Sequence, residues 1–245
     1  LPVTIPREIL HAAGVLPVGI IGGGDQVEII RGDAYFQSYI CHLPRSVVEL
    51  EVSGRLSSLD GMIFPSICDV VRNLTGVWQL LFPHKYARYL DLPQNCVSSL
   101  GGSWYASELA TLLMEMGTLA GTHPTDDALR ASIDAYNHLR RRMRRLSVMR
   151  AAEPWRVPAS EVHLLTRAGL VLPVEDFIRL LDDYLAAVQE EDRKPYDFVR
   201  VVLAGAFCEQ PPLDLIRTLE RAGCYVVDDD CLLVHRWPED PIPTE

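Results

Sequence analysis

The sequence lacks several motifs by which an enzyme class is often identified directly. Its six cysteines form no Cys-x-x-Cys pair, so their spacing alone does not identify a metal site. It contains no G-x-x-x-x-G-K-[ST] phosphate loop, so we do not expect this chain to hydrolyse ATP itself. The run Gly22–Gly24 lacks the spacing of a dinucleotide-binding turn, and no G-x-S-x-G elbow of a hydrolase occurs.

Long apolar runs and excess positive charge are also missing. The most apolar stretch, Val15–Ile21, is too short to span a bilayer and is interrupted by Pro17 and Gly19. No charged-then-apolar leader is visible, so a secretory signal and a disulfide framework are not expected. The net charge of -10 argues against a nucleic-acid or membrane-surface partner.

What the sequence does contain is typical of an α/β protein. Its 245 residues, 48% hydrophobic and 23% charged, suffice for one large domain or two small ones. Strand and helix patterns alternate, which favours mostly parallel sheets. Strands are expected at residues 15–21, 61–65, 86–92, 198–204 and 224–227. Helices are expected at residues 6–14, 69–81, 107–119, 126–149, 160–169, 174–189 and 213–222.

A proline-bounded segment, Pro154–Pro158, follows the longest expected helix and is a plausible domain junction. We therefore expect an N-terminal α/β domain at residues 1–150 and a second α/β domain at residues 159–245. The long helix carries five arginines between Arg140 and Arg145. They form either a solvated face or a surface that attracts an anion, such as a coenzyme A phosphate or an acidic partner.

Some cysteines follow expected strands, where ligands gather in open α/β sheets. Cys68 and Cys208 each come after a strand and before a helix, and Cys231 follows the last strand. Cys41 lies in a loop-like stretch, Ser38–Arg45, and Cys224 begins a strand, which favours a core position. A helix N-terminus favours the thiolate, the form that binds metals. Buried inert thiols remain the alternative for each cysteine.

Three carboxylates, Asp228, Asp229 and Asp230, end the last expected strand. They are either a Mg²⁺ site or, as we favour, a turn whose side chains accept backbone N–H groups.

Long runs of residues, among them Phe64-Pro65-Ser66-Ile67-Cys68, resemble the C subunits of ATP-dependent benzoyl-CoA reductases. A looser version of the pattern is shared with the 2-hydroxyacyl-CoA dehydratases. The resemblance covers essentially the whole chain. It is carried by the runs Pro6–Gly14, Gly32–Ser46, Asp60–Leu74, Tyr89–Asn95, Pro154–Pro158, Phe207–Ile216 and Gly223–Asp230.

The resemblance implies two Rossmann/flavodoxin-like parallel-sheet domains with helical connections, the second incomplete. It also implies an oxidoreductase of the cytoplasm of anaerobes, built as a heterotetramer. Two paired cluster-bearing subunits hold benzoyl-CoA, and two ATPase subunits activate electrons that reduced ferredoxin donates to the complex. The implied reaction is the two-electron, dearomatising reduction of benzoyl-CoA to a cyclohexadiene carbonyl-CoA.

The resemblance further implies a 4Fe-4S cluster held by three cysteines, of which Cys41 and Cys68 are the first two. The family's third cysteine lies in a Ser-Phe-Cys-Asp-type stretch, which we expect beyond Glu245, so the sequence is expected to be a truncated subunit. Cys208 is an alternative third ligand. We expect the sulfurs of Cys41 and Cys68 to lie within roughly 8 Å of each other, with Arg45 offsetting their charge.

Two other functions stay open. The chain could belong to a 2-hydroxyacyl-CoA dehydratase, which is a lyase, or it could be a cluster-free fragment that binds partners. The segments Phe207–Pro212 and Tyr35–Tyr39 favour the reductase over the dehydratase.

Overall fold

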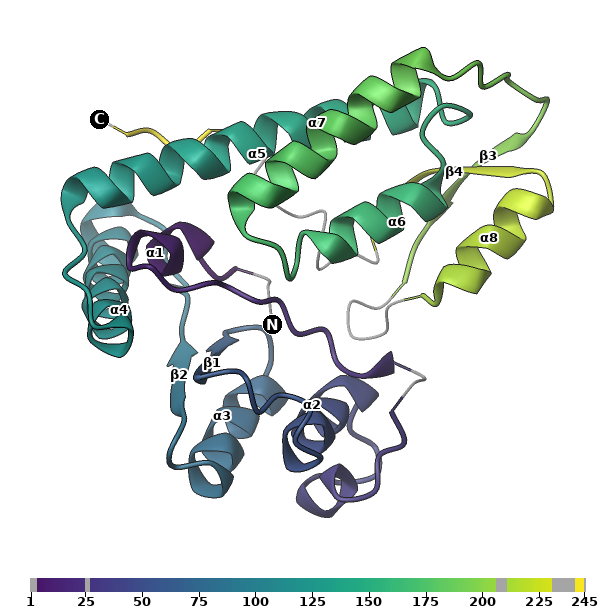
Figure 1. Cartoon of the computed structure of the whole chain (residues 1–245). Coiled ribbons are helices and arrows are strands. Elements are labelled where there is room, and N and C mark those ends of the chain that lie inside the picture. Colours follow the sequence, from purple (N-terminus) through teal and green to yellow (C-terminus); the bar gives the residue numbers. More distant parts are fainter. Residues whose placement is uncertain (1–3, 25–26, 206–210, 231–240, 245) are drawn as a thin grey trace. The chain divides into compact units, whose positions relative to one another are not determined.

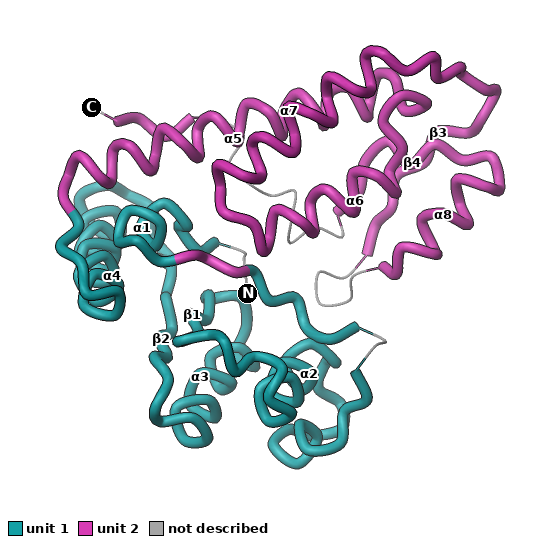
Figure 2. The backbone as a smooth tube through the Cα atoms, in the orientation of Figure 1, with its two compact units in different colours: residues 1–15, 19–124 teal, residues 16–18, 125–245 magenta. Residues whose placement is uncertain are grey.

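The computed structural model of the chain describes residues 4–24, 27–205, 211–230 and 241–244. Its internal contacts divide the chain into two compact units (Figure 2). Unit 1 comprises residues 1–15 and 19–124, and unit 2 comprises residues 16–18 and 125–245. Among the described residues, no helix has both the length and the apolar character needed to cross a membrane.

Unit 1 is built around one parallel strand pair that is joined by a helix (Figure 1). The strands β1 and β2 pair in parallel, from Gly61 opposite Tyr86 to Pro65 opposite Leu90. The elements of the unit are α1 (Arg7–Ala12), the 3-10 helix η2 (Gly32–Tyr35), α2 (His42–Val52), β1 (Gly61–Pro65), α3 (Asp69–Leu81), β2 (Tyr86–Leu90), the π-helical turn η3 (Ser98–Gly102) and α4 (Ser103–Ala120).

The core of unit 1 follows from the spacing of apolar residues on α3. Val71, Leu74 and Trp78 recur at helical intervals, so they share one face, and that face is buried. Helix α3 contacts both strands. The Trp78 ring meets the ring of Phe64 on β1 edge to face, with centroids 5.7 Å apart. This packing holds the β1–α3 connection, which contains Cys68.

Unit 2 contains a second parallel strand pair and three longer helices. Strands β3 and β4 pair in parallel from Val199 opposite Cys224, with a register irregularity between Val201 and Val202. The elements are α5 (Asp126–Ala152), α6 (Ala159–Ala168), α7 (Val174–Glu190), β3 (Val199–Leu203), α8 (Leu213–Arg221) and β4 (Cys224–Asp229).

The main core of unit 2 lies among α5, α6 and α7. Apolar residues at helical spacing on each helix form one buried cluster. Arg142 of α5 adds a two-pronged ion pair with Asp182 of α7, at 2.8 and 2.9 Å. The buried members are Tyr136, Leu139, Met143, Leu146, Val157, Val162, Leu165, Val174, Phe177, Leu181, Leu185 and Val188.

The α/β class and the parallel pairing are confirmed, and the expected bounds of β1 and α3 are confirmed to the residue. Each described sheet has two strands, so the division into two Rossmann-type domains stays a prediction. The strand expected at residues 15–21 is wrong, because the structure forms none there. Pro17 cannot donate to a ladder and Gly19 weakens a strand, which explains this outcome.

Helix α2 is a further correction, because His42–Arg45 was expected to be loop-like and is helical. Proline is unfavourable in the interior of a helix, so Pro44 argued against a helix at these residues. It lies in the first turn, where backbone N–H groups have no partner within the helix, so its missing N–H costs nothing there.

The long helix α5 was expected in a first domain, but it is grouped with unit 2. The reason is that its buried stripe packs against α7. The main division between the units falls between Pro124 and Thr125 in the sequence, whereas the expected junction was Pro154–Pro158. The folding of residues 1–150 and 159–245 as separate domains stays a prediction.

Candidate functional site

Cys41 and Cys68 each lie directly before a helix of unit 1. Both have non-helical backbone angles, and they occupy the N-cap positions of α2 and α3. Cys68 is exposed, Cys41 is half-buried, and neither is in a disulfide. Helices α2 and α3 contact each other (Figure 1). Two thiols are thus held at the N-termini of adjacent helices, while the proximity of their sulfurs stays a prediction.

This donor chemistry suits part of an iron–sulfur ligand set. Both thiols lie at the N-termini of helices of 11 and 13 residues, where the helix dipole has its positive end. In the part of the chain that the structure describes, no group of three or more His, Cys, Asp or Glu side chains could hold a metal ion. Cys208 and Cys231 lie outside the described residues, so the alternative third ligand stays a prediction.

The segment that precedes Cys41 is anchored by a carboxylate of α2. Glu49 Oε2 accepts the backbone N–H groups of Ile30, Arg31 and Gly32 at 3.0, 2.6 and 2.8 Å. The Gly32 N–H, with those of Ile30 and Arg31, holds the pKa of Glu49 below its usual range, against the opposing effect of burial. Glycine is required at position 32, because a Cβ there would lie 2.3 Å from the backbone oxygen of Arg45.

The charge on Glu49 is expected to stabilise unit 1. Replacing Glu49 by glutamine should lower the free energy of unfolding by about 1–2 kcal/mol at neutral pH, since hydrogen bonds to a charged acceptor are the stronger kind. The pKa is lower in the folded state, so this stabilisation is complete above the ordinary carboxyl value near 4.5. It is lost as the pH falls through the folded-state value.

Urea denaturation of the wild type and of Glu49→Gln across the acidic range measures this difference. A gap between the two proteins that stayed constant as the pH fell would contradict the assignment.

Arg45 was expected to offset charge near the cysteines. Its guanidinium pairs with Asp33 of η2 at 2.8 Å, with the two side chains 19% and 51% exposed. The ion pair therefore ties α2 to η2, and an effect of the Arg45 charge on the cysteines stays a prediction.

A polar group at the carboxyl ends of β1 and β2 was missed by the sequence reasoning. Ser66 directly follows β1, and Asp91 directly follows β2, and their side chains are hydrogen-bonded. A strand was expected at residues 86–92, which would place Asp91 inside it. The sequence reasoning therefore did not identify Asp91 as a residue at the strand end. Pro93, which cannot donate to a ladder, was the signal that the strand ends earlier.

The three aspartates at the end of β4, Asp228, Asp229 and Asp230, are engaged within the protein. Asp228 accepts the N–H of Asp229 at 2.9 Å, and Asp230 accepts the N–H of Gly205 at 2.6 Å. Asp229 pairs with the buried Arg150 at 2.8 Å. The expectation that they accept N–H groups is confirmed for Asp228 and Asp230.

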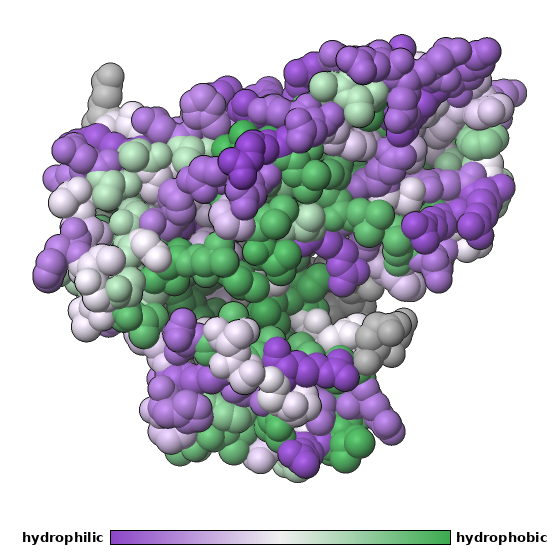
Figure 3. Space-filling view, in the orientation of Figure 1, coloured by the Kyte–Doolittle hydropathy of each residue, from purple (hydrophilic) through white to green (hydrophobic). Residues whose placement is uncertain are grey.

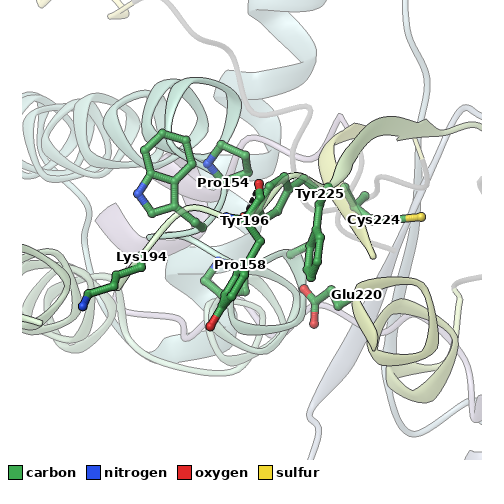
Figure 4. Close-up of a pocket in the computed structure, with 11 residues that line it drawn as sticks. Pro154, Pro158, Lys194, Tyr196, Glu220, Cys224 and Tyr225 are labelled. Carbon is green, nitrogen blue, oxygen red and sulfur yellow. Dashed lines mark hydrogen bonds between the residues drawn. The ribbon is translucent and has the colours of Figure 1, made fainter. Parts of the chain in front are cut away.

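Unit 2 contains a pocket of about 200 Å³ with mainly apolar walls (Figure 4). Tyr196 and Phe198 stack with ring centroids 5.3 Å apart, and Phe198 lies 5.0 Å from Tyr225. The carboxylate of Glu220 accepts the Ser160 N–H at 2.9 Å, which caps α6. The lining residues are Pro154, Trp155, Pro158, Ala159, Lys194, Tyr196, Phe198, Glu220, Cys224, Tyr225 and Val226. The aromatic rings of the pocket pack against one another, and its carboxylate caps α6. We therefore assign the pocket no chemistry.

The five arginines of α5 between Arg140 and Arg145 divide into two groups. Arg140 is buried and donates to Asn137 at 2.9 Å, and Arg142 pairs with Asp182. The other three are exposed. They are Arg141, Arg144 and Arg145. Where α5 and α7 run in Figure 1, the space-filling view shows mainly hydrophilic residues along the upper edge (Figure 3). These three arginines form a solvated face, and their attraction of an anionic ligand or partner stays a prediction.

Comparison with known proteins gives a consistent result over the whole chain. A family described as 2-hydroxyglutaryl-CoA dehydratase, D-component, matches residues 2–245. The C subunit of benzoyl-CoA reductase from Thauera aromatica is 53% identical over 244 residues, covering 100% of this chain and 63% of that protein.

More distant relatives include the beta subunit of lactoyl-CoA dehydratase from Anaerotignum propionicum, 26% identical over 94% of this chain and 60% of that protein. The beta subunit of (R)-2-hydroxyglutaryl-CoA dehydratase of Acidaminococcus fermentans is 24% identical, with the same two coverages. The chain thus spans 60 to 63% of the length of these relatives. It belongs to the family of the 2-hydroxyglutaryl-CoA dehydratase D-component.

Proposed function

We propose that the chain is part of a subunit of an ATP-dependent benzoyl-CoA reductase. The observation that carries this proposal is the 53% identity, over 100% of the chain, to the C subunit of a benzoyl-CoA reductase. The dehydratase relatives are no more than 26% identical over a similar length. The reaction is the addition of two electrons and two protons to the aromatic ring, which yields a cyclohexadiene carbonyl-CoA.

Cys41 and Cys68 are the residues that would hold a 4Fe-4S cluster, together with a third cysteine. A bound cluster supplies electrons one at a time at low potential. The contribution of this chain is to present two cysteines at the N-termini of α2 and α3, at the positive ends of the helix dipoles. The anchoring of η2 by Glu49 and Arg45 of α2 supports the segment that leads to Cys41.

The remaining features of the proposal follow from the same relationship. The third ligand lies beyond Glu245, with Cys208 as the alternative. The partners are a paired cluster-bearing subunit and two ATPase subunits, with reduced ferredoxin as electron donor, in the cytoplasm. The two βαβ motifs belong to two Rossmann/flavodoxin-like domains.

A dehydratase that acts on a 2-hydroxyacyl-CoA is the second candidate. The family description and the lactoyl-CoA dehydratase match favour it. That reaction eliminates water without a net change of oxidation state between substrate and product, so it consumes no net electrons. The two functions therefore differ in their electron requirement.

The distinguishing experiment uses the anaerobically purified complex that contains this chain. With ATP and a low-potential donor, we expect benzoyl-CoA to be consumed with two electrons per product, and 2-hydroxyacyl-CoA to remain unchanged. Mass spectrometry of the acyl-CoA products measures both. Dehydration of the 2-hydroxyacyl-CoA with no reduction of benzoyl-CoA would establish the second candidate instead.

A further inference from the structure

Three side chains at the carboxyl ends of β1 and β2 form a continuous hydrogen-bonded chain. The Tyr89 hydroxyl donates to Ser66 Oγ at 2.9 Å, and Ser66 Oγ donates to Asp91 Oδ1 at 2.7 Å. The backbone N–H of Leu92 donates to the same Asp91 oxygen at 2.9 Å. All three bonds are partly shielded from solvent. Ser66 is thus held between two side chains of the neighbouring strand segment.

The backbone of Ser66 and Ile67 is also constrained. The Ser66 N–H donates to the Leu90 carbonyl at 3.0 Å, which extends the β1–β2 ladder beyond the strand. The Ile67 N–H donates to the Pro65 carbonyl at 2.9 Å, which closes a three-residue turn. The chain therefore leaves the sheet at one defined point, two residues before Cys68.

The other side of Cys68 is tied to the same strand through α3. The Arg72 N–H donates to the Cys68 carbonyl at 3.2 Å and forms part of the first helical turn. The Arg72 guanidinium carbon lies 5.4 Å from the centre of the Tyr89 ring, a cation–π contact. Tyr89 thus contacts both Ser66, before the cysteine, and Arg72, one turn after it.

We propose that Tyr89, Ser66 and Asp91 are positioning residues for Cys68, which fix the direction in which its thiolate is presented. This inference rests on the proposed role of Cys68 as a cluster ligand. The physical reason is that Cys68 is exposed in the part of the chain that the structure describes, so packing there restricts its side chain little. Ligands need to be held within a fraction of an ångström, and a hydrogen-bonded second layer of residues provides this.

The test compares Ser66→Ala, which removes the shared hydroxyl, with Ser66→Thr, which keeps it, in the complete complex. Hydrogen exchange of the amides in residues 66–72 is measured first, because it does not depend on a cluster. We expect exchange in this segment to become about fivefold faster in Ser66→Ala, the change in local opening that one lost hydrogen bond produces. Exchange in α2 should stay unchanged, and Ser66→Thr should behave as the wild type.

The second measurement is electron paramagnetic resonance of the reduced, iron-loaded complex. We expect Ser66→Ala and Tyr89→Phe to shift the g values of the cluster signal while the iron content is retained. A residue that only stabilised the sheet would lower the iron content without changing the signal of the clusters that remain. Ser53→Ala is the matched control, since it removes an exposed hydroxyl of the same unit that donates to Leu50.

Uniformly faster exchange throughout unit 1, or an unchanged signal in both variants, would overturn the proposal. If the wild-type complex holds no iron, the cluster assignment of the proposed function fails. The exchange measurement then still decides whether these residues hold the Cys68 segment. The two failures are therefore distinguishable.

Discussion

Replacing Cys68 by serine is expected to remove most of the iron that this chain holds in the complex, and with it the reduction of benzoyl-CoA. Serine is a hard alkoxide donor at best and is protonated at neutral pH, whereas a cluster is held by thiolates. Cys41→Ser should have the same effect, because both residues are proposed ligands of one cluster. Colorimetric iron and sulfide analysis of the anaerobically purified complex measures the loss.

The control for this prediction is Cys96→Ser. Cys96 is exposed, and it lies in the segment between β2 and η3. We expect this variant to retain iron and activity at wild-type levels. Iron content that is unchanged in Cys68→Ser, or equally reduced in Cys96→Ser, would exclude Cys68 as a specific ligand.

Replacing Lys85 by methionine is expected to lower the free energy of unfolding by about 3–5 kcal/mol, the usual cost of leaving one partner of a buried ion pair alone. Lys85 Nζ lies 2.7 Å from Glu51 Oε1, and the side chains are only 9% and 7% exposed. The same ammonium donates to the Leu56 carbonyl at 2.8 Å. The substitution would leave a buried carboxylate without its cation, where α2 ends and β2 begins.

Urea denaturation measures this loss, and two further variants calibrate it. Lys85→Met combined with Glu51→Leu should recover most of the stability, because the unpaired charge is then absent. Arg130→Met breaks the exposed pair with Asp127, whose side chains are 55% and 93% exposed, and should cost less than about 1 kcal/mol. Equal losses in Lys85→Met and Arg130→Met would show that burial of the Lys85 pair has no energetic consequence.

Local sequence determined much of the secondary structure, because helices and strands depend on short-range periodicity. The stripe of Val71, Leu74 and Trp78 predicts α3, and the short apolar run Gly61–Pro65 predicts β1. Their order places Cys68 between a strand and a helix, which is a property of the sequence alone. Thr125, a residue type that favours the position before a helix, caps α5 by accepting the Ala128 N–H at 3.2 Å.

The tertiary structure alone decided which residues surround the cysteines. Cys41 is an N-cap because α2 begins at His42, despite Pro44. Pairings such as Glu49 with Gly32, and Ser66 with Asp91, join residues 17 and 25 positions apart. No local periodicity encodes such distances, since they depend on how strands and helices pack. Residues 15–21 form no strand because two conditions fail: Pro17 cannot donate to a ladder, and no described strand pairs with this run.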